Sequence, residues 1–82
     1  MSHTPHELHD EFPDLADQIT ALKTGNAHFA RLAEAYHEIN RAVHRAETNV
    51  EPVSDTAETE MRRRRAALKD ELYRMLTAGS QG

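Results

Sequence analysis

The chain has 82 residues, a formal net charge of −4 and no cysteine. A chain of this length forms one small domain at most, and the lack of cysteine excludes disulfides, thiolate metal sites and cysteine nucleophiles. No stretch approaches the roughly 20 apolar residues that cross a bilayer, and residues 1–10 lack the pattern of a secretion signal. We therefore expect a cytoplasmic protein without a membrane span.

A seven-residue repeat of large apolar side chains runs through the first fifty residues. Such a repeat places its members along one side of a helix, and this side must be buried against another helix. The repeat therefore indicates helix packing and association. Its members are Leu8, Leu15, Leu22, Phe29, Tyr36, Val43 and Val50.

Residues 1–25 predict a helical arm in two short pieces. Thr4, Pro5 and Glu7 form a helix start, in which the Glu7 side chain closes a capping box. Pro13 ends this first helix, because the residue before a proline disfavours helical dihedrals, and it opens the second. The apolar stripe of the arm consists of Leu8, Phe12, Leu15, Ile19 and Leu22.

Two long helices follow the arm. Gly25 ends the arm and Asn26 caps a helix over 27–48, in which apolar residues keep a regular three-and-four spacing. The segment 49–54 contains Pro52 and connects to a last helix over 55–77. Ser54 or Asp55 caps that helix, with Asp55 and Glu58 forming a second capping box.

Equal helix lengths and a short connection predict an antiparallel, coiled-coil-like helical hairpin. The fold class is therefore all-α, with a short N-terminal arm (1–25), the hairpin (26–78) and a disordered tail (79–82). This pairing brings Glu34 and Glu38 towards Arg65 and Lys69. The centre of the hairpin is expected at Phe29, Leu32, Tyr36, Ile39, Leu68 and Leu72.

Three short motifs carry a family resemblance: Phe-Pro-Asp at 12–14, Tyr-His-Glu-Ile-Asn at 36–40 and Ala-Leu-Lys-Asp-Glu-Leu at 67–72. Over residues 10–77 the chain closely resembles the YdcH-like family, which consists of small bacterial proteins of unknown function. The resemblance implies an α-helical hairpin and no assigned activity. It brings no catalytic or ligand residues to this chain.

Six histidines raise the question of a metal site. His6, His9 and Asp10 have a spacing that metal sites on helices use, but no third fixed ligand and no buried setting accompany them. His37 and His44, seven apart, are expected on a flank of the hairpin. We therefore expect a solvated helix surface here, with no metal and no cofactor.

Four consecutive arginines occupy 62–65, and residues 62–82 hold six bases but only two acids. On a helix, successive side chains point about 100° apart, so these four cannot all face one phosphate backbone. We expect a solvated face with acidic partners. The alternatives are contact with nucleic acid or with an anionic lipid surface.

The sequence contains no serine-centred elbow and no glycine-rich phosphate loop, and a hairpin offers no cleft that would shift a pKa. We therefore expect a non-enzymatic protein without a small-molecule substrate. Its predicted function is that of a structural or adaptor protein that associates through helices with itself, as a dimer or higher oligomer, or with another protein. The candidate association residues are Leu8, Phe12, Leu15, Ile19, Leu22, Tyr36, Val43 and Met61, with the arm as the main interface.

The alternative function is that of a small nucleic-acid-associated protein. Its candidate basic patch consists of Arg62, Arg63, Arg64, Arg65 and Lys69.

Overall fold

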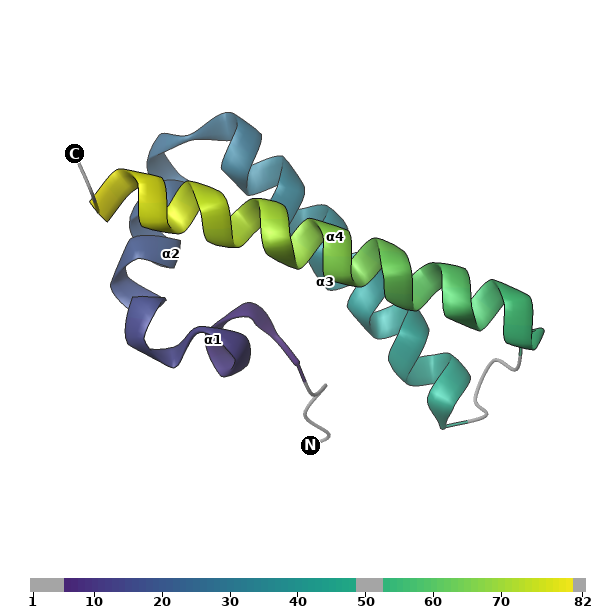
Figure 1. Ribbon diagram of the computed structural model, residues 1–82. Helices are drawn as coiled ribbons and strands as arrows, with labels where there is room; N and C mark the ends of the chain where they lie inside the picture. Colours follow the sequence, from purple (N-terminus) through teal and green to yellow (C-terminus); the bar gives the residue numbers. More distant parts are fainter. Residues whose placement is uncertain (1–5, 49–52, 81–82) are drawn as a thin grey trace.

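The computed structural model describes residues 6–48 and 53–80, and this part of the chain contains helices and no strand. The all-α prediction is therefore confirmed. The helices are α1 (Leu8–Glu11), the 3-10 helix η1 (Pro13–Leu15), α2 (Ala16–Gly25), α3 (Ala27–Glu47) and α4 (Asp55–Ser80), in the order that Figure 1 shows.

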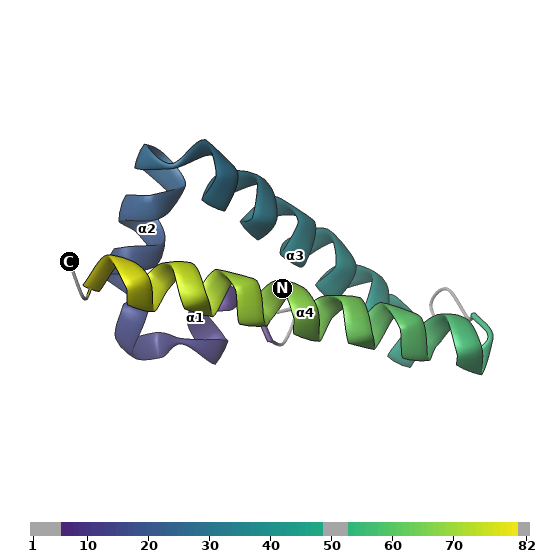
Figure 2. The ribbon, with the colours of Figure 1, turned by 45° about the horizontal axis from the view of Figure 1, so that its top comes forward.

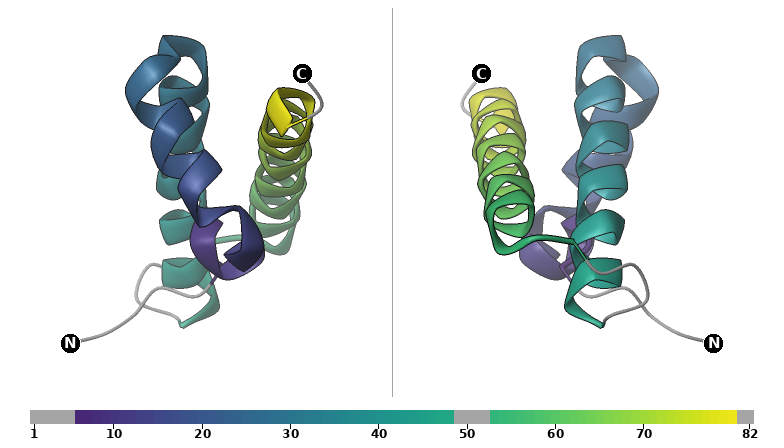
Figure 3. Two further views of the ribbon diagram at one scale, coloured as in Figure 1. Left: turned by 90° about the vertical axis from the view of Figure 1, so that its left-hand side faces the viewer. Right: turned by 90° about the vertical axis from the view of Figure 1, so that its right-hand side faces the viewer.

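The two long helices, α3 and α4, pack against each other, and the N-terminal arm folds back onto them. Figure 2 shows α2 leaving the start of α3 and crossing towards the last turns of α4. Figure 3 shows α1 on one side of the α3–α4 pair, close to both helices. The arm thus covers one side of the pair, and no described helix covers the opposite side.

One hydrophobic core joins the arm to both long helices. Leu8 and Ile19 of the arm are almost fully buried, as are three residues of α3 and two of α4. Burying a side chain of this size contributes roughly 1.5–3 kcal/mol, so the arm supplies a substantial part of a small core. The members of the core are Leu8, Ile19, Phe29, Ala33, Tyr36, Leu72 and Leu76.

The joints between helices follow local chemistry. Pro13 is the first residue of η1, as predicted, and Asn26 caps α3 by accepting a hydrogen bond from the Phe29 amide at 3.0 Å. Ser54 caps α4 by accepting from the Ala57 amide at 3.1 Å. Of the two predicted caps, Ser54 is therefore the one used, and the Glu58 amide bonds to the Ser54 carbonyl in place of the expected capping box with Asp55.

Three further details differ from the sequence prediction. Glu7 precedes α1 without capping it, because its carboxylate bonds to α3 instead. Ile39, expected in the centre, lies half-buried outside the core cluster. The last helix continues to Ser80, beyond the predicted end. Some predictions fall outside the described residues; they concern Thr4, Pro5, Val50, Pro52 and the final two residues.

Replacing core Leu72 by alanine should lower the free energy of unfolding by about 2–5 kcal/mol, because Leu72 is completely buried and the change leaves a cavity. Ile39→Ala is the matched comparison on the half-buried edge and should cost clearly less. Urea unfolding followed by circular dichroism measures both. Equal losses of unfolding free energy for the two variants would show that Leu72 is not buried more deeply than Ile39.

Gly25→Ala should raise the free energy of unfolding by about 0.4–1 kcal/mol. Gly25 ends α2 without a positive φ, and a Cβ built there meets no atom within 4 Å. Alanine therefore fits the folded chain without a clash. It also lowers the conformational entropy of the unfolded chain, which favours folding. A lower melting temperature for Gly25→Ala would contradict this account of the joint.

Candidate functional site

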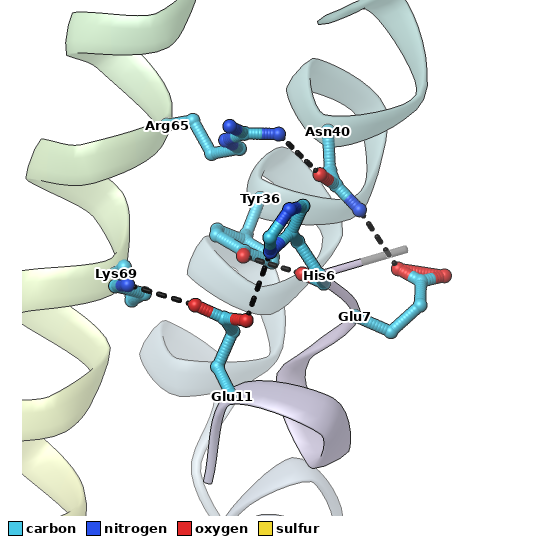
Figure 4. A network of polar contacts seen from close by, with 7 residues as sticks. All are labelled: His6, Glu7, Glu11, Tyr36, Asn40, Arg65 and Lys69. Atoms are coloured by element: carbon cyan, nitrogen blue, oxygen red, sulfur yellow. Dashed lines mark hydrogen bonds and ion pairs between the residues drawn. The ribbon is translucent and has the colours of Figure 1, made fainter. Parts of the chain in front are cut away.

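Polar side chains fasten the beginning of the arm to both long helices (Figure 4). We call this cluster the polar junction; its members are His6, Glu7, Glu11, Tyr36, His37, Asn40, Arg65 and Lys69. Tyr36 is 1% exposed, and its hydroxyl donates a 2.5 Å hydrogen bond to the His6 carbonyl. The His6 backbone has a φ of 64°, which is uncommon for a residue with a side chain. The hydrogen bond from Tyr36 helps to hold that conformation.

Asn40 links three parts of the chain from a fully buried position on α3. Its Nδ2 donates to the Glu7 carboxylate at 3.3 Å, and its Oδ1 accepts from the Arg65 guanidinium at 2.9 Å. The Nδ1 of His37 lies 2.9 Å from the same Glu7 oxygen. Glu7, the residue predicted to cap a helix, therefore anchors the arm to α3.

Glu11 makes the second connection, from α1 to α4. Its carboxylate lies 2.8 Å from the Lys69 Nζ and 3.0 Å from the His6 Nδ1. The hydrogen bond from Lys69, with a smaller effect of His6, holds the pKa of Glu11 below its usual value. At neutral pH this carboxylate is therefore ionised and stabilises the docked arm, and the stabilisation falls as the pH drops below the ordinary range of glutamate.

The predicted contacts of Arg65 and Lys69 with Glu34 and Glu38 are wrong. Arg65 bonds to Asn40 and Lys69 to Glu11, whereas both α3 glutamates are exposed. The reason is that the arm places Glu11 beside Lys69, while Asn40 on the buried side of α3 is the acceptor for Arg65.

The candidate basic patch is divided among several directions, as the helical spacing predicts. Arg62 pairs with Glu47 at 2.9 Å and also with Glu58, and the hydrogen bond that it donates to Glu47 raises the pKa of its guanidinium. Arg65 and Lys69 belong to the polar junction. Arg63 and Arg64 are exposed and make no ion pair within the described residues. The structure thus does not bring the five cations together on one surface.

The candidate association residues of the arm lie mostly inside the single chain. Leu8 and Ile19 are buried in the core, and the other three arm residues are packed partly buried against it. The Phe12 ring also stacks on Tyr73 of α4, with ring centres 5.3 Å apart. Tyr36 and Val43 are buried as well. Of the candidates, Met61 is half-buried on the opposite side and lines a shallow depression there.

This depression lies on the side of the α3–α4 pair away from the arm, which we call the open face. Ile39 and Met61 form its apolar floor, and Glu60, Arg63 and Arg64 surround it. Half-buried Ala35 and Ala42 lie near Ile39 on the same side of α3. The residues that define the open face are Arg31, Ala35, Glu38, Ile39 and Ala42 on α3, and Glu60, Met61, Arg64 and Glu71 on α4.

A family model described as a protein of unknown function (DUF465) matches residues 29–76. This match spans more than half of the chain. The chain belongs to this family. YdcH-like proteins belong to the same family, so the resemblance found in the sequence is confirmed. The matched segment begins at Phe29 and ends at Leu76, both buried in the core, and it does not include the arm. No curated protein and no solved structure matches the chain.

The chemistry of the described side chains centres on packing. Residues 6–48 and 53–80 contain no group of three or more metal-binding side chains placed to hold an ion. None of their helices is both long and apolar enough to span a membrane.

The polar junction was missed from the sequence; the available signal was Asn40, a polar residue one helical turn after Tyr36 on the buried side of α3.

Tyr36→Phe should reduce the dependence of stability on alkaline pH. Burial, with a contribution from the charge of Glu11, raises the pKa of Tyr36 to about 12 in the folded chain. An unfolded tyrosine ionises near pH 10, so the folded state loses stability as the pH rises from about 10 towards 12. Urea unfolding across that range should show a shallower decline for Tyr36→Phe than for the wild type.

Tyr73→Phe is the matched control, because Tyr73 is 47% exposed. It should keep the alkaline decline of the wild type. At neutral pH, Tyr36→Phe should cost about 0.5–1.5 kcal/mol through the lost hydrogen bond to His6. Parallel pH curves for Tyr36→Phe and the wild type would refute the proposed role of burial.

Proposed function

We propose that this chain is a small, non-enzymatic structural or adaptor protein that acts through helix–helix association. The observation that carries the proposal is the open face, where Ile39 and Met61 remain partly accessible between two long helices. A helix pair covered on one side only leaves an apolar strip that another helical surface can bury.

The proposal includes an antiparallel, coiled-coil-like hairpin of α3 and α4 as the unit that presents this face. Two contacts support that arrangement: Arg62 pairs with Glu47, and Arg65 bonds to Asn40. A later residue on α4 thus lies beside an earlier residue on α3, as expected of two antiparallel helices. The family match over 29–76 coincides with these two helices, which further supports them as the shared unit.

The open face replaces the arm as the proposed association surface. The arm stripe was the first candidate because it had no partner in the sequence pattern. Leu8 and Ile19 are buried against Phe29 and Leu72 within one chain. An interface made by these residues would require the arm to leave the core, with the loss of the burial that stabilises it.

A role in nucleic-acid binding receives less support from the geometry. Arg62, Arg65 and Lys69 are engaged inside the chain, and glutamates accompany the remaining arginines on the open face. Nucleic acid would be repelled by those carboxylates. Retention on nucleic acid that persists at physiological salt, weakens as salt is raised and is lost on Arg63→Glu and Arg64→Glu replacement would favour this alternative over protein association.

In-cell photo-crosslinking tests the proposed function. A photoreactive phenylalanine analogue replaces Met61 in the full-length protein, which is expressed in cells of the organism that encodes it. The expected result is a discrete crosslinked protein species, because the probe sits on the floor of the open face. The same analogue at exposed Lys23, on the arm side, is the control and should give much less of that species.

Equal adduct yields at positions 61 and 23, or no adduct at either, would contradict the proposal. The mass of the species obtained from position 61 identifies the partner as a second copy or as a different protein.

A further inference from the structure

We infer that the partner on the open face is a second copy of this chain, packed so that α3 of one chain lies on α4 of the other. This inference rests on the proposed function and names the partner of the same surface. The two hairpins would form a four-helix arrangement around a two-fold axis that runs parallel to the helices.

The charges on the two edges of the open face are arranged in opposite order. On α3, Arg31 and Glu38 are seven residues apart; on α4, Arg64 and Glu71 are also seven apart. Seven residues make nearly two helical turns, so each pair lies along one side of its helix. Because α4 runs antiparallel to α3, the order of the charges differs along any one direction. Helix α3 presents a base and then an acid, whereas α4 presents an acid and then a base.

Intrachain contacts fix the side on which these charges lie. Glu38 precedes Asn40 by two residues, and Asn40 bonds towards the arm. Two residues correspond to about 200° around a helix, so Glu38 is directed away from the arm, where it lines a shallow depression with Arg41 and Arg45. It lies one helical turn after Ala35 and one before Ala42, along the edge of α3 that carries these two alanines. The same relation holds on α4, where Arg64 and Glu71 follow Arg62 and Lys69 by two residues. Lys69 bonds to Glu11 of the arm. All four charges therefore border the open face.

Most of these charges make no ion pair within residues 6–48 and 53–80. Arg31, Glu38 and Arg64 are exposed and make no ion pair with any residue that the structure describes. Glu71 pairs with exposed Arg74 of the same helix. Charges of this kind are available to another molecule without breaking a buried interaction.

One alignment of the two copies along the helix axes brings both sets of opposite charges together. Arg65 bonds to Asn40, so these two residues lie at about the same level of the helix pair, and Glu38 and Arg64 lie within about one helical turn of each other in level. A two-fold axis parallel to the helices keeps each level and places α3 over α4 of the second copy. Glu38 then faces Arg64 of the second copy, and Arg31 faces its Glu71. The axis repeats both contacts, giving four opposite-charge contacts per dimer.

The same alignment brings the apolar floors together. Ile39 and Met61 of each copy both lie on the side that faces the axis, and the small side chains of Ala35 and Ala42 allow the helices to approach. The paired helices extend about 30 Å, so the buried surface is at the small end for protein interfaces. We therefore expect a dissociation constant on the order of 10 µM.

Charge reversal with sedimentation equilibrium of the full chain tests this pairing. Glu38→Arg and Arg64→Glu should each weaken dimerisation at least tenfold, because each places like charges opposite each other twice per dimer. The double variant exchanges the two charges and should restore the dissociation constant to within about threefold of the wild type. Circular dichroism checks that all variants remain folded.

Two control variants change the net charge by the same amounts elsewhere. Asp70→Arg, on a side of α4 turned away from the open face, matches Glu38→Arg. Lys23→Glu, on α2, matches Arg64→Glu. Both positions are exposed, and both variants should keep the dissociation constant within about twofold of the wild type.

The inference is overturned if the wild type stays monomeric at about 200 µM, well above the expected constant. It is also overturned if the controls weaken the dimer as much as the single reversals, or if the exchange does not restore it. A monomeric chain whose position 61 crosslinks to a different protein refutes the second copy and leaves the proposed function standing. A monomeric chain without that crosslink refutes both.

Discussion

Packing of the arm against the long helices is the interaction on which the rest of the structure depends. A pair of helices has two broad sides, and a chain of 82 residues has little else with which to cover them. Leu8 and Ile19 complete the core on one side by contacting the cluster around Phe29, Tyr36 and Leu72. Because the arm is short and is used there, no described helix covers the other side of the pair.

The polar junction specifies the side of the α3–α4 pair on which the arm packs. Apolar contacts alone tolerate several placements of a short helix, whereas buried polar groups must find particular partners. Asn40 reaches both Glu7 and Arg65, so it relates the arm, α3 and α4 to one another at once. A displaced arm would take the Glu7 carboxylate away from this buried amide, and the loss of a hydrogen bond to a charged group costs about 1.5–3 kcal/mol.

The sequence predicted the helices and their joints well, because these depend on local chemistry. Pro13, Asn26 and the region before Asp55 act at the positions where the pattern places them. The destination of the arm could not be predicted in the same way, since its apolar stripe fits a second chain as well as its own. Glu7 illustrates the difficulty: its spacing suits a cap, yet the fold brings it to His37, 30 residues away.

The arginine run shows why a local composition does not define a surface. Four successive side chains point in four directions, so Arg62 reaches the end of α3 and Arg65 reaches Asn40, while Arg64 borders the open face. The run therefore divides between contacts made by its two outer residues and an exposed surface carrying its two inner residues, and does not form one cationic patch. α4 contacts both α3 and the arm and also borders solvent, so it carries charged residues on several sides. Consecutive arginines supply this, with the two outer residues of the run used inside the chain.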